Sequence, residues 1–163
     1  MIRSKQVGLV SLFSVIFALG TAQAGKNVFV QPGTIAVGTP GVVKVTLPSS
    51  SKAYQVKCNF FGVDQVAKAI AYIGKLLPEE EATKFRATVT LLIDQIGKGP
   101  GSVLKMSAKG ANGANFGAEV TPGNTTFGDG RKIMVPAGTS EITINLRISE
   151  GFGGIYYIVV EEQ

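Results

Sequence analysis

Residues 132–148 carry the clearest periodic pattern in the chain, and this pattern limits what the chain can fold into. From position 142, apolar and polar residues alternate without a break: Ile142, Thr143, Ile144, Asn145, Leu146, Arg147 and Ile148. A period of two is typical of a β-strand with one face in a core and the other in water. Ile133 and Val135 continue the apolar phase before a Pro-Ala-Gly turn at 136–138. The segment therefore predicts two strands joined by a bend, with further strands completing their core.

Several other segments predict strands, and turns rich in glycine and proline separate them. These segments are residues 27–30, 34–37, 42–47, 54–61, 103–108 and 155–160, with a Gln-Pro-Gly turn at 31–33 between the first two. The last segment, Ile-Tyr-Tyr-Ile-Val-Val, is apolar on both faces, which predicts a central strand or one that a partner covers. Residues 110–130 predict a long loop that Phe116, Val120 and Phe127 pin to the core.

The alternation stops at residues 63–77, where the apolar positions are 63, 66, 67, 70, 73 and 77. This spacing forms one stripe along a helix. We expect a short helical insertion that packs across one end of the sheets. The alternative is an exposed amphipathic helix that binds a membrane or a partner.

Residues 84–93 fit two structures. A helix that begins at Pro78 and its three following glutamates would place Phe85, Val89, Leu92 and Ile93 on one side. A strand would place Phe85, Ala87, Val89, Leu91 and Ile93 on one side. Thr88 and Thr90 have restricted χ1 angles, which favour a strand. We therefore predict a strand here.

The first 24 residues have the three-part pattern of a secretory signal peptide. Arg3 and Lys5 precede an apolar run at 7–20, and Ala-Gln-Ala at 22–24 is a small-x-small cleavage site. The alternative, a membrane anchor, would need about 20 apolar residues to span a bilayer. We expect a signal peptide at 1–24 and one mature domain at 25–163, periplasmic or extracellular at the cell surface.

The amino-acid composition excludes several classes of catalytic site and metal site. The chain has no histidine and a single cysteine, which excludes Ser-His-Asp and Cys-His catalysis, imidazole zinc sites and CxxC redox chemistry. Cys58 lies in phase with Val56 and Phe60, so we expect a small buried residue; the alternative is a reactive or intermolecular thiol. Loss of Arg3 and Lys5 lowers the formal net charge from +5 to +3, which is not a nucleic-acid footprint.

Carboxylates are the remaining candidates for catalysis. A glycosidase needs two of them about 5–10 Å apart, and the candidates here are Glu119, Asp129, Glu141 and Glu150. Each of the four falls in a loop or at a strand end, where solvated surface charge is the simpler interpretation. Asp129 lacks the D-x-D-x-D spacing of a calcium loop. We therefore assign no catalytic, cofactor-binding or metal-ligating residue, and expect no cofactor and no enzyme activity.

The strand and turn pattern also resembles a known class of domain. The series strand, Gly-Pro-Gly-Ser turn, strand, then I-x-V-P-A-G-T-S-x-I-x-I-x-L resembles the later half of immunoglobulin-like modules in bacterial exported proteins, over residues 85–148. The resemblance implies an all-β, immunoglobulin-like β-sandwich of seven to nine strands, with the helical insertion near 63–77 added to it. It implies no functional residues, because such modules share a scaffold and not a site.

These features predict an exported, non-catalytic structural or interaction module whose partner is another protein or a cell-surface component, with no nucleic acid and no membrane span after signal cleavage. Two alternatives stay open, as does the oligomeric state. One is a surface-fibre subunit, because Gly-Ile-Tyr-Tyr at 154–157 and the alternation after it are similar to the last strand of chaperone–usher pilins. The other is a carbohydrate-binding module, for which the exposed aromatic candidates are Tyr72, Phe116, Phe127 and Phe152.

We predict that the exported protein begins at Gly25, because signal peptidase cuts after a small-x-small sequence. Intact-mass spectrometry of protein recovered from the exported fraction checks this expectation. A chain that keeps Met1 and stays with the membrane fraction would contradict it.

Overall fold

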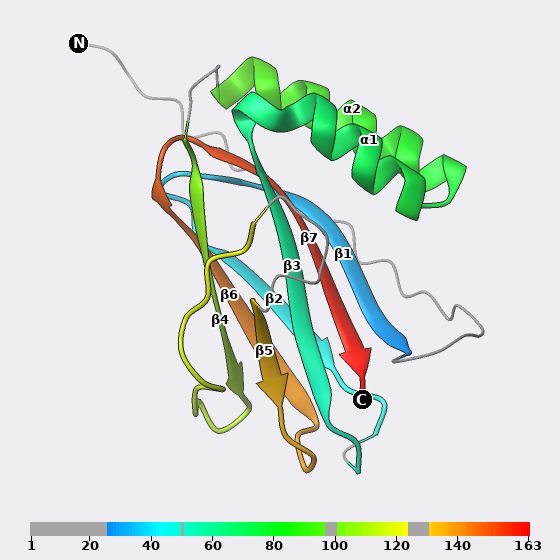
Figure 1. Ribbon diagram of the computed structural model, residues 1–163, viewed down its shortest axis with the longest axis vertical. Helices are drawn as coiled ribbons and strands as arrows, with labels where there is room; N and C mark the ends of the chain where they lie inside the picture. Colours follow the sequence, from blue (N-terminus) through cyan, green and yellow to red (C-terminus); the bar gives the residue numbers. More distant parts are fainter. Residues whose placement is uncertain (1–25, 50, 97–100, 124–130) are drawn as a thin grey trace.

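The computed structural model describes residues 26–49, 51–96, 101–123 and 131–163 (Figure 1). The expected signal peptide at 1–24 lies outside these residues, as do Phe127 and Asp129. The elements in chain order are β1 (Asn27–Ala36), β2 (Gly41–Thr46), β3 (Tyr54–Gly62), the 3₁₀ turn η1 (Val63–Gln65), α1 (Val66–Leu76), α2 (Glu79–Ile96), β4 (Val103–Gly110), β5 (Lys132–Val135), β6 (Glu141–Glu150) and β7 (Gly153–Glu162).

The seven strands of the described residues form two antiparallel sheets packed as a β-sandwich. Sheet A has the order β1-β7-β3-β5, and sheet B has the order β2-β6-β4. The strand predictions at 42–47, 54–61, 103–108 and 132–148 are confirmed, and the last of these segments supplies one strand to each sheet. Gly138 in the turn between them has φ +93°, a left-handed conformation that glycine adopts without steric cost.

An inner core fills the space between the two sheets. Its side chains come from alternate positions of every strand, and Ile142, Ile144 and Leu146 of β6 are at most 2% exposed. Phe116 and Val120 pack against this core from the loop after β4, as the sequence predicted. The period-two pattern of β6 therefore identified one wall of the core correctly.

A second core lies on the other side of sheet A, beneath the two helices. Val66, Ala69 and Ile73 of α1 and Phe85 and Val89 of α2 are buried there. They cover Ile155, Tyr157 and Val159 of β7, so the helices and the two sheets form three layers (Figure 1). β7 is central, between β1 and β3, as its two apolar faces predicted. The helix stripe packs on the outer face of sheet A, and not only across one end of the sandwich.

The strand predicted at 84–93 is wrong, because these residues belong to α2 and the insertion continues from 63 to 96. Ala82, Phe85 and Val89 are buried at helical spacing, whereas Leu91, which a strand would have buried with Phe85, is 62% exposed. The threonines do not prevent the helix, since their hydroxyls donate to carbonyl oxygens four residues earlier: Thr83 to Glu79, Thr88 to Lys84 and Thr90 to Arg86. Packing against sheet A outweighs their local preference for a strand.

The predicted turn at 31–33 is also wrong, because β1 is continuous from Asn27 to Ala36 and pairs with β7 along this length. Val37 N donates to Phe152 O, 2.8 Å away, so these two residues form a hydrogen-bonded pair. Hydrogen-bonded pairs of an antiparallel ladder recur at every second residue, which places them at the odd-numbered residues of β1. Pro32 therefore occupies a non-bonded position, where its missing N–H faces away from β7. A proline is tolerated at such a position of an edge strand.

The alternation at 54–61 places Gln55, Lys57 and Asn59 on the outward face of β3 and so predicts that they face water, which is wrong for two of them. Gln55 and Asn59 do point away from the inner core, yet they are only 5% and 1% exposed. The two faces of the strand were assigned correctly, but the outer side of sheet A is itself covered at Gln55 and Asn59. Alternation reveals two faces of a strand and not what lies against each.

We predict that Ile144→Ala lowers the free energy of unfolding by about 2–5 kcal/mol, the usual cost of a cavity in place of a buried aliphatic side chain. Thr143→Ala is the matched control: Thr143 is half-buried on the opposite face, so its loss should cost below about 1 kcal/mol. Denaturant melts of both variants measure the difference. Equal losses would contradict the assignment of the two faces.

Candidate functional site

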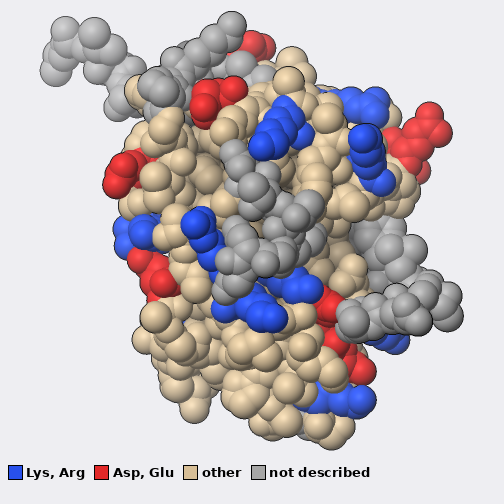
Figure 2. All heavy atoms as spheres, viewed as in Figure 1, with Lys and Arg blue, Asp and Glu red and all other residues tan. Residues whose placement is uncertain are grey.

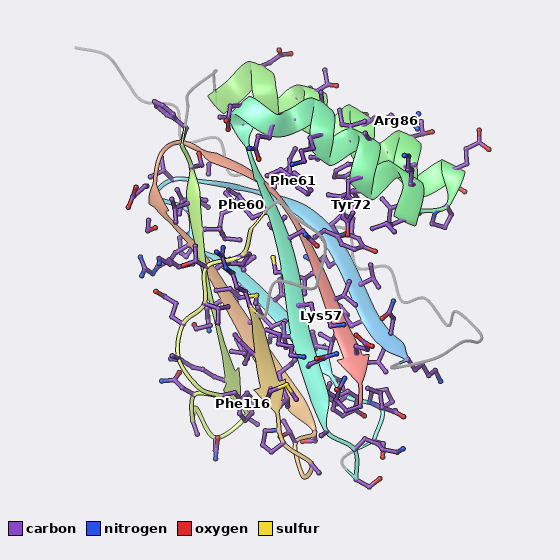
Figure 3. The ribbon with its side chains drawn as sticks, in the orientation of Figure 1. Lys57, Phe60, Phe61, Tyr72, Arg86 and Phe116 are labelled. Atoms are coloured by element: carbon purple, nitrogen blue, oxygen red, sulfur yellow. The ribbon has the colours of Figure 1, made fainter. Side chains whose placement is uncertain are left out.

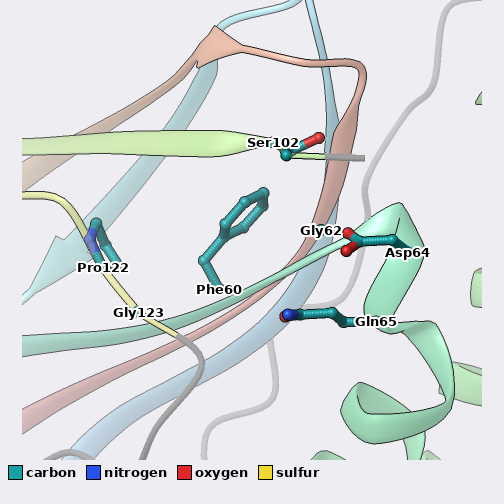
Figure 4. Close-up of a pocket in the computed structure, with 8 residues that line it drawn as sticks. Phe60, Gly62, Asp64, Gln65, Ser102, Pro122 and Gly123 are labelled. Atoms are coloured by element: carbon teal, nitrogen blue, oxygen red, sulfur yellow. The ribbon is translucent and has the colours of Figure 1, made fainter. Parts of the chain in front are cut away.

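The described residues form a pocket of about 230 Å³ beside the end of β3 (Figure 4). Its lining residues are Phe60, Gly62, Asp64, Gln65, Gly101, Ser102, Pro122 and Gly123. Asp64 is the one ionisable group among them, and it is exposed. Ser102 Oγ accepts hydrogen bonds from the backbone N–H groups of Phe152 at 3.2 Å and Gly153 at 3.1 Å. The serine hydroxyl thus fixes the turn between β6 and β7, and the pocket offers little chemistry beyond one carboxylate.

Of the carboxylates considered for catalysis, one is held in an ion pair and two lie at opposite ends of one strand. Glu119 forms a two-pronged ion pair with Arg147, at 2.7 Å from Nη2 and 3.1 Å from Nε. Glu141 and Glu150 are the first and last residues of the ten-residue strand β6. At about 3.3 Å per residue they lie about 30 Å apart, well beyond the spacing of a glycosidase pair. Within the described ranges, no group of three His, Cys, Asp or Glu residues could hold a metal ion.

Cys58 is buried in the inner core, as its strand phase predicted. Burial raises the pKa of its thiol above the ordinary range, and a hydrogen bond involving the backbone of Tyr157 opposes this rise only in part. The thiol therefore stays protonated at neutral pH. A protonated, enclosed thiol is a poor nucleophile and a poor metal ligand.

The aromatic candidates for a sugar-binding platform lie in separate places (Figure 3). Tyr72 packs against the helix-side core, with its ring centre 5.8 Å from that of Phe61. Phe116 packs against the inner core near the opposite end of the sandwich, and Phe152 lies in the turn between β6 and β7, half exposed. These three rings do not form one flat surface on which a sugar ring could stack.

Sequence reasoning missed a buried polar cluster at the carboxyl end of β7. The Glu161 carboxylate pairs with the Lys57 ammonium and accepts a hydrogen bond from Gln55 Nε2 at 3.1 Å. Glu161 and Gln55 are only 6% and 5% exposed. The cluster joins β7 to β3 side by side, since Gln55 and Glu161 are cross-strand partners. A glutamate that follows a fully apolar strand was its only signal in the sequence.

The solvent face of sheet B is the candidate binding surface, because it is a broad sheet face that no described element covers. We define this face by the outward residues of its strands: Val42, Lys44 and Thr46 of β2, Thr143, Asn145 and Arg147 of β6, and Lys105, Ser107 and Lys109 of β4. All nine are exposed or half-buried. The register places Lys44, Thr143 and Lys109 in one row across the three strands.

The charge on this face is basic and partly neutralised. The Glu119 carboxylate neutralises Arg147, whereas Lys105 Nζ donates to the uncharged hydroxyl Thr121 Oγ1 at 2.6 Å. Elsewhere the charges are mixed: on the face seen in Figure 2, Lys and Arg side chains are dispersed among Asp and Glu. A dispersed pattern is typical of a soluble surface and differs from the basic stripe of a nucleic-acid binder.

No helix of the described residues is both long enough and apolar enough to cross a membrane. Neither a protein-family model nor a curated protein matches this chain.

We predict that Cys58 resists thiol reagents in the native protein and reacts fully once the protein is unfolded, because burial both shields the thiol and raises its pKa. Raising the pH from about 7 to about 9 should therefore hardly accelerate labelling of the folded protein. A variant with Cys58→Ala and Ser51→Cys is the control, since Ser51 is exposed and its replacement should label at once. Rapid labelling of native Cys58 would contradict the burial.

Proposed function

We propose that this protein is an exported, non-catalytic structural or interaction module that works in the periplasm or at the cell surface. The observation that carries the proposal is the asymmetry of the sandwich. Sheet A has the second sheet on one side and α1 and α2 on the other, whereas sheet B turns a polar face to solvent. The signal-peptide pattern at 1–24 supports export.

The strand pairing supports an immunoglobulin-like module as the finer description of the fold. Consecutive strands β2 and β3 lie in opposite sheets and pair with the consecutive strands β6 and β7. Immunoglobulin sandwiches pair their second strand with their fifth and their third with their sixth in the same way. The chain departs from that scheme where β1 takes the place beside β7 that the last strand fills in an immunoglobulin domain.

The state of the reactive groups supports a non-catalytic role. The Ser102 hydroxyl holds a turn, the Cys58 thiol is protonated and enclosed, and Glu119 is paired with Arg147. A nucleophile needs an adjacent base and an open approach, and a general acid needs a shifted pKa in a cleft. The described groups serve structure instead, which favours recognition by a surface over chemistry at a site.

The partner of such a module is another protein or a cell-surface component. The solvent face of sheet B has hydroxyl, amide and ammonium groups on a flat surface, the composition of a polar and wet interface. Two of its four cations, Lys44 and Lys109, lie in one row with Thr143 and favour a partner that carries negative charge.

A surface-fibre subunit is the second candidate, and the position of β1 favours it. β1 is the first strand of the described chain, runs antiparallel to the last strand, β7, and places Phe29 and Ile35 in the inner core and Val30 in the helix-side core. A strand of this kind can be supplied by a neighbouring copy. The strand is ten residues long and continues past Pro32, so it is long enough to act as a donor.

A disulfide trap separates the two candidates. Val30 and Val159 face each other at a non-bonded position of the β1–β7 ladder, where Cα atoms lie about 4.5 Å apart. We predict that Val30→Cys with Val159→Cys, in a Cys58→Ala background, oxidises within one chain. The purified mature protein should also sediment as a soluble monomer. Val30→Cys alone is the control and should give no internal link.

The fibre would give the opposite results. The two thiols would join different copies into a ladder on a non-reducing gel. The lone mature chain would aggregate, and a peptide with the sequence of residues 27–36 would restore its solubility.

A further inference from the structure

The four outermost strands of the two sheets differ in how their free edges are protected. The free edge of β1 has Pro32 at its centre, with the missing N–H facing outward. The edge of β4 is paired: Met106 and Val120 exchange two backbone hydrogen bonds of 2.9 and 2.8 Å, and Phe116 N donates to Ala108 O. β5 is only four residues long. These are three of the devices by which natural sheets avoid edge-to-edge association.

The edge of β2 has none of these three devices, and its one charged residue is the exposed Lys44. Pro40 and Pro48 lie outside the strand, and the six residues Gly41–Thr46 include no proline and no bulge against β6. In the described part of the chain, β6 is the only strand that pairs with β2. Val42 on this strand is 59% exposed, among the most exposed large apolar side chains described.

The hydrogen-bond register identifies which backbone groups of β2 face outward. Leu47 N donates to Ser140 O at 2.9 Å, so bonded pairs of the β2–β6 ladder recur at Val45, Val43 and Gly41. The pairing of β6 with β4 gives the same register. Met106 lies opposite Leu146 and directs both of its backbone groups away from β6, so the backbone groups of Leu146 point to Gly41 of β2. The N–H and C=O groups of Val42, Lys44 and Thr46 therefore point away from sheet B.

We propose that the edge of β2 is an acceptor site for an extended strand of a partner protein, with an acidic side chain placed beside Lys44. The outward groups of Val42, Lys44 and Thr46 would bond that strand in the manner of β-strand addition. The flanking prolines limit the added strand to about the length of β2. This inference gives the proposed interaction module its class of partner and rests on that proposed function.

Charge decides between a partner strand and a second copy of this chain. Directly opposite residues of neighbouring strands have Cβ atoms about 4.5–5.5 Å apart, so opposite charges there attract and like charges repel. Two copies that joined through β2 in antiparallel fashion around Lys44 would bring the two Lys44 side chains together. A strand with a central glutamate or aspartate instead pairs with Lys44 and lies in the same row as Lys109.

Amide hydrogen exchange measured by NMR tests the site directly. The probe is a capped heptapeptide, Ser-Thr-Val-Glu-Val-Thr-Ser, and its partner is the same peptide with lysine in place of the glutamate. At about ten times its Kd, the glutamate peptide should slow exchange about tenfold at the amides of Val42, Lys44 and Thr46. The amides of Val43 and Val45 should not change, because they already donate to β6.

Two variants separate the backbone bond from the charge. Lys44→Pro removes the central outward donor while it leaves the ladder with β6 intact, so it should abolish binding of the glutamate peptide. Lys44→Thr keeps the donor and removes the charge, so it should weaken binding and end the preference for glutamate over lysine. If Lys44→Pro fails to fold, an N-methylated glutamate peptide with wild-type protein replaces it and should not bind.

Three results would overturn the proposal. The first is slow exchange at Val42, Lys44 and Thr46 in the free protein, which would mean that the edge is already occupied. The second is equal binding of the two peptides by wild-type protein, or unchanged binding by Lys44→Pro. The third is protection that rises with protein concentration without peptide, which would make a second copy the partner. In each of these three cases the disulfide trap can still show that β1 pairs with β7 of its own chain. Failure of the strand-acceptor proposal is therefore distinguishable from failure of the proposed self-contained module.

Discussion

The structure depends on the burial of both faces of β7. Tyr156, Ile158 and Val160 face sheet B, while Ile155, Tyr157 and Val159 face the helices, and all six are at most 4% exposed. Burial of one such side chain contributes about 1.5–3 kcal/mol, so the three that the helices cover contribute about 5–9 kcal/mol. A whole domain has a net stability of about 5–15 kcal/mol. The burial that the helices provide is therefore comparable to the stability of a whole domain, and the fold requires the helical layer.

Close approach of the neighbouring strands makes this central position possible. An added Cβ at Gly33 of β1 would lie 2.3 Å from the Tyr156 ring, and one at Gly154 would lie 2.1 Å from Phe61 O of β3. Glycine at these two positions lets β1 and β3 lie against β7 around its large side chains. At the other end of β7, Glu161, Lys57 and Gln55 hold β7 to β3 through polar contacts that are nearly closed to water.

The same asymmetry shapes what the molecule can offer to a partner. Strands β1, β3 and β7 of sheet A are enclosed between two cores, whereas Met134 on the outer face of β5 is 51% exposed. Sheet B is enclosed on one side and presents hydroxyl, amide and ammonium groups on the other. Because Ser102, Cys58 and Glu119 are engaged within the protein, the surface and the strand edges are the parts that remain for recognition.

The sequence by itself determined the position of each strand that has one apolar face and one polar face. Ile142, Ile144 and Leu146 could be assigned to a core because period two arises within one strand and needs no neighbour. The stripe at 63–77 was recognisable as a helix for the same reason.

Only the tertiary structure decided what lies against each face. Phe85 and Val89 fit a strand and a helix equally, and it was packing on sheet A that selected the helix. Pro32 suggested a turn because proline has no N–H to donate within a sheet. The sequence does not show that its nitrogen faces the free edge of β1, where no donor is needed. Gln55 and Asn59 looked solvent-exposed, yet they are buried, because burial depends on segments distant in the sequence. Periodicity in a sequence reflects the geometry of a single strand or helix. The burial of its faces and the pairing of its edges depend on other segments, which the periodicity does not contain.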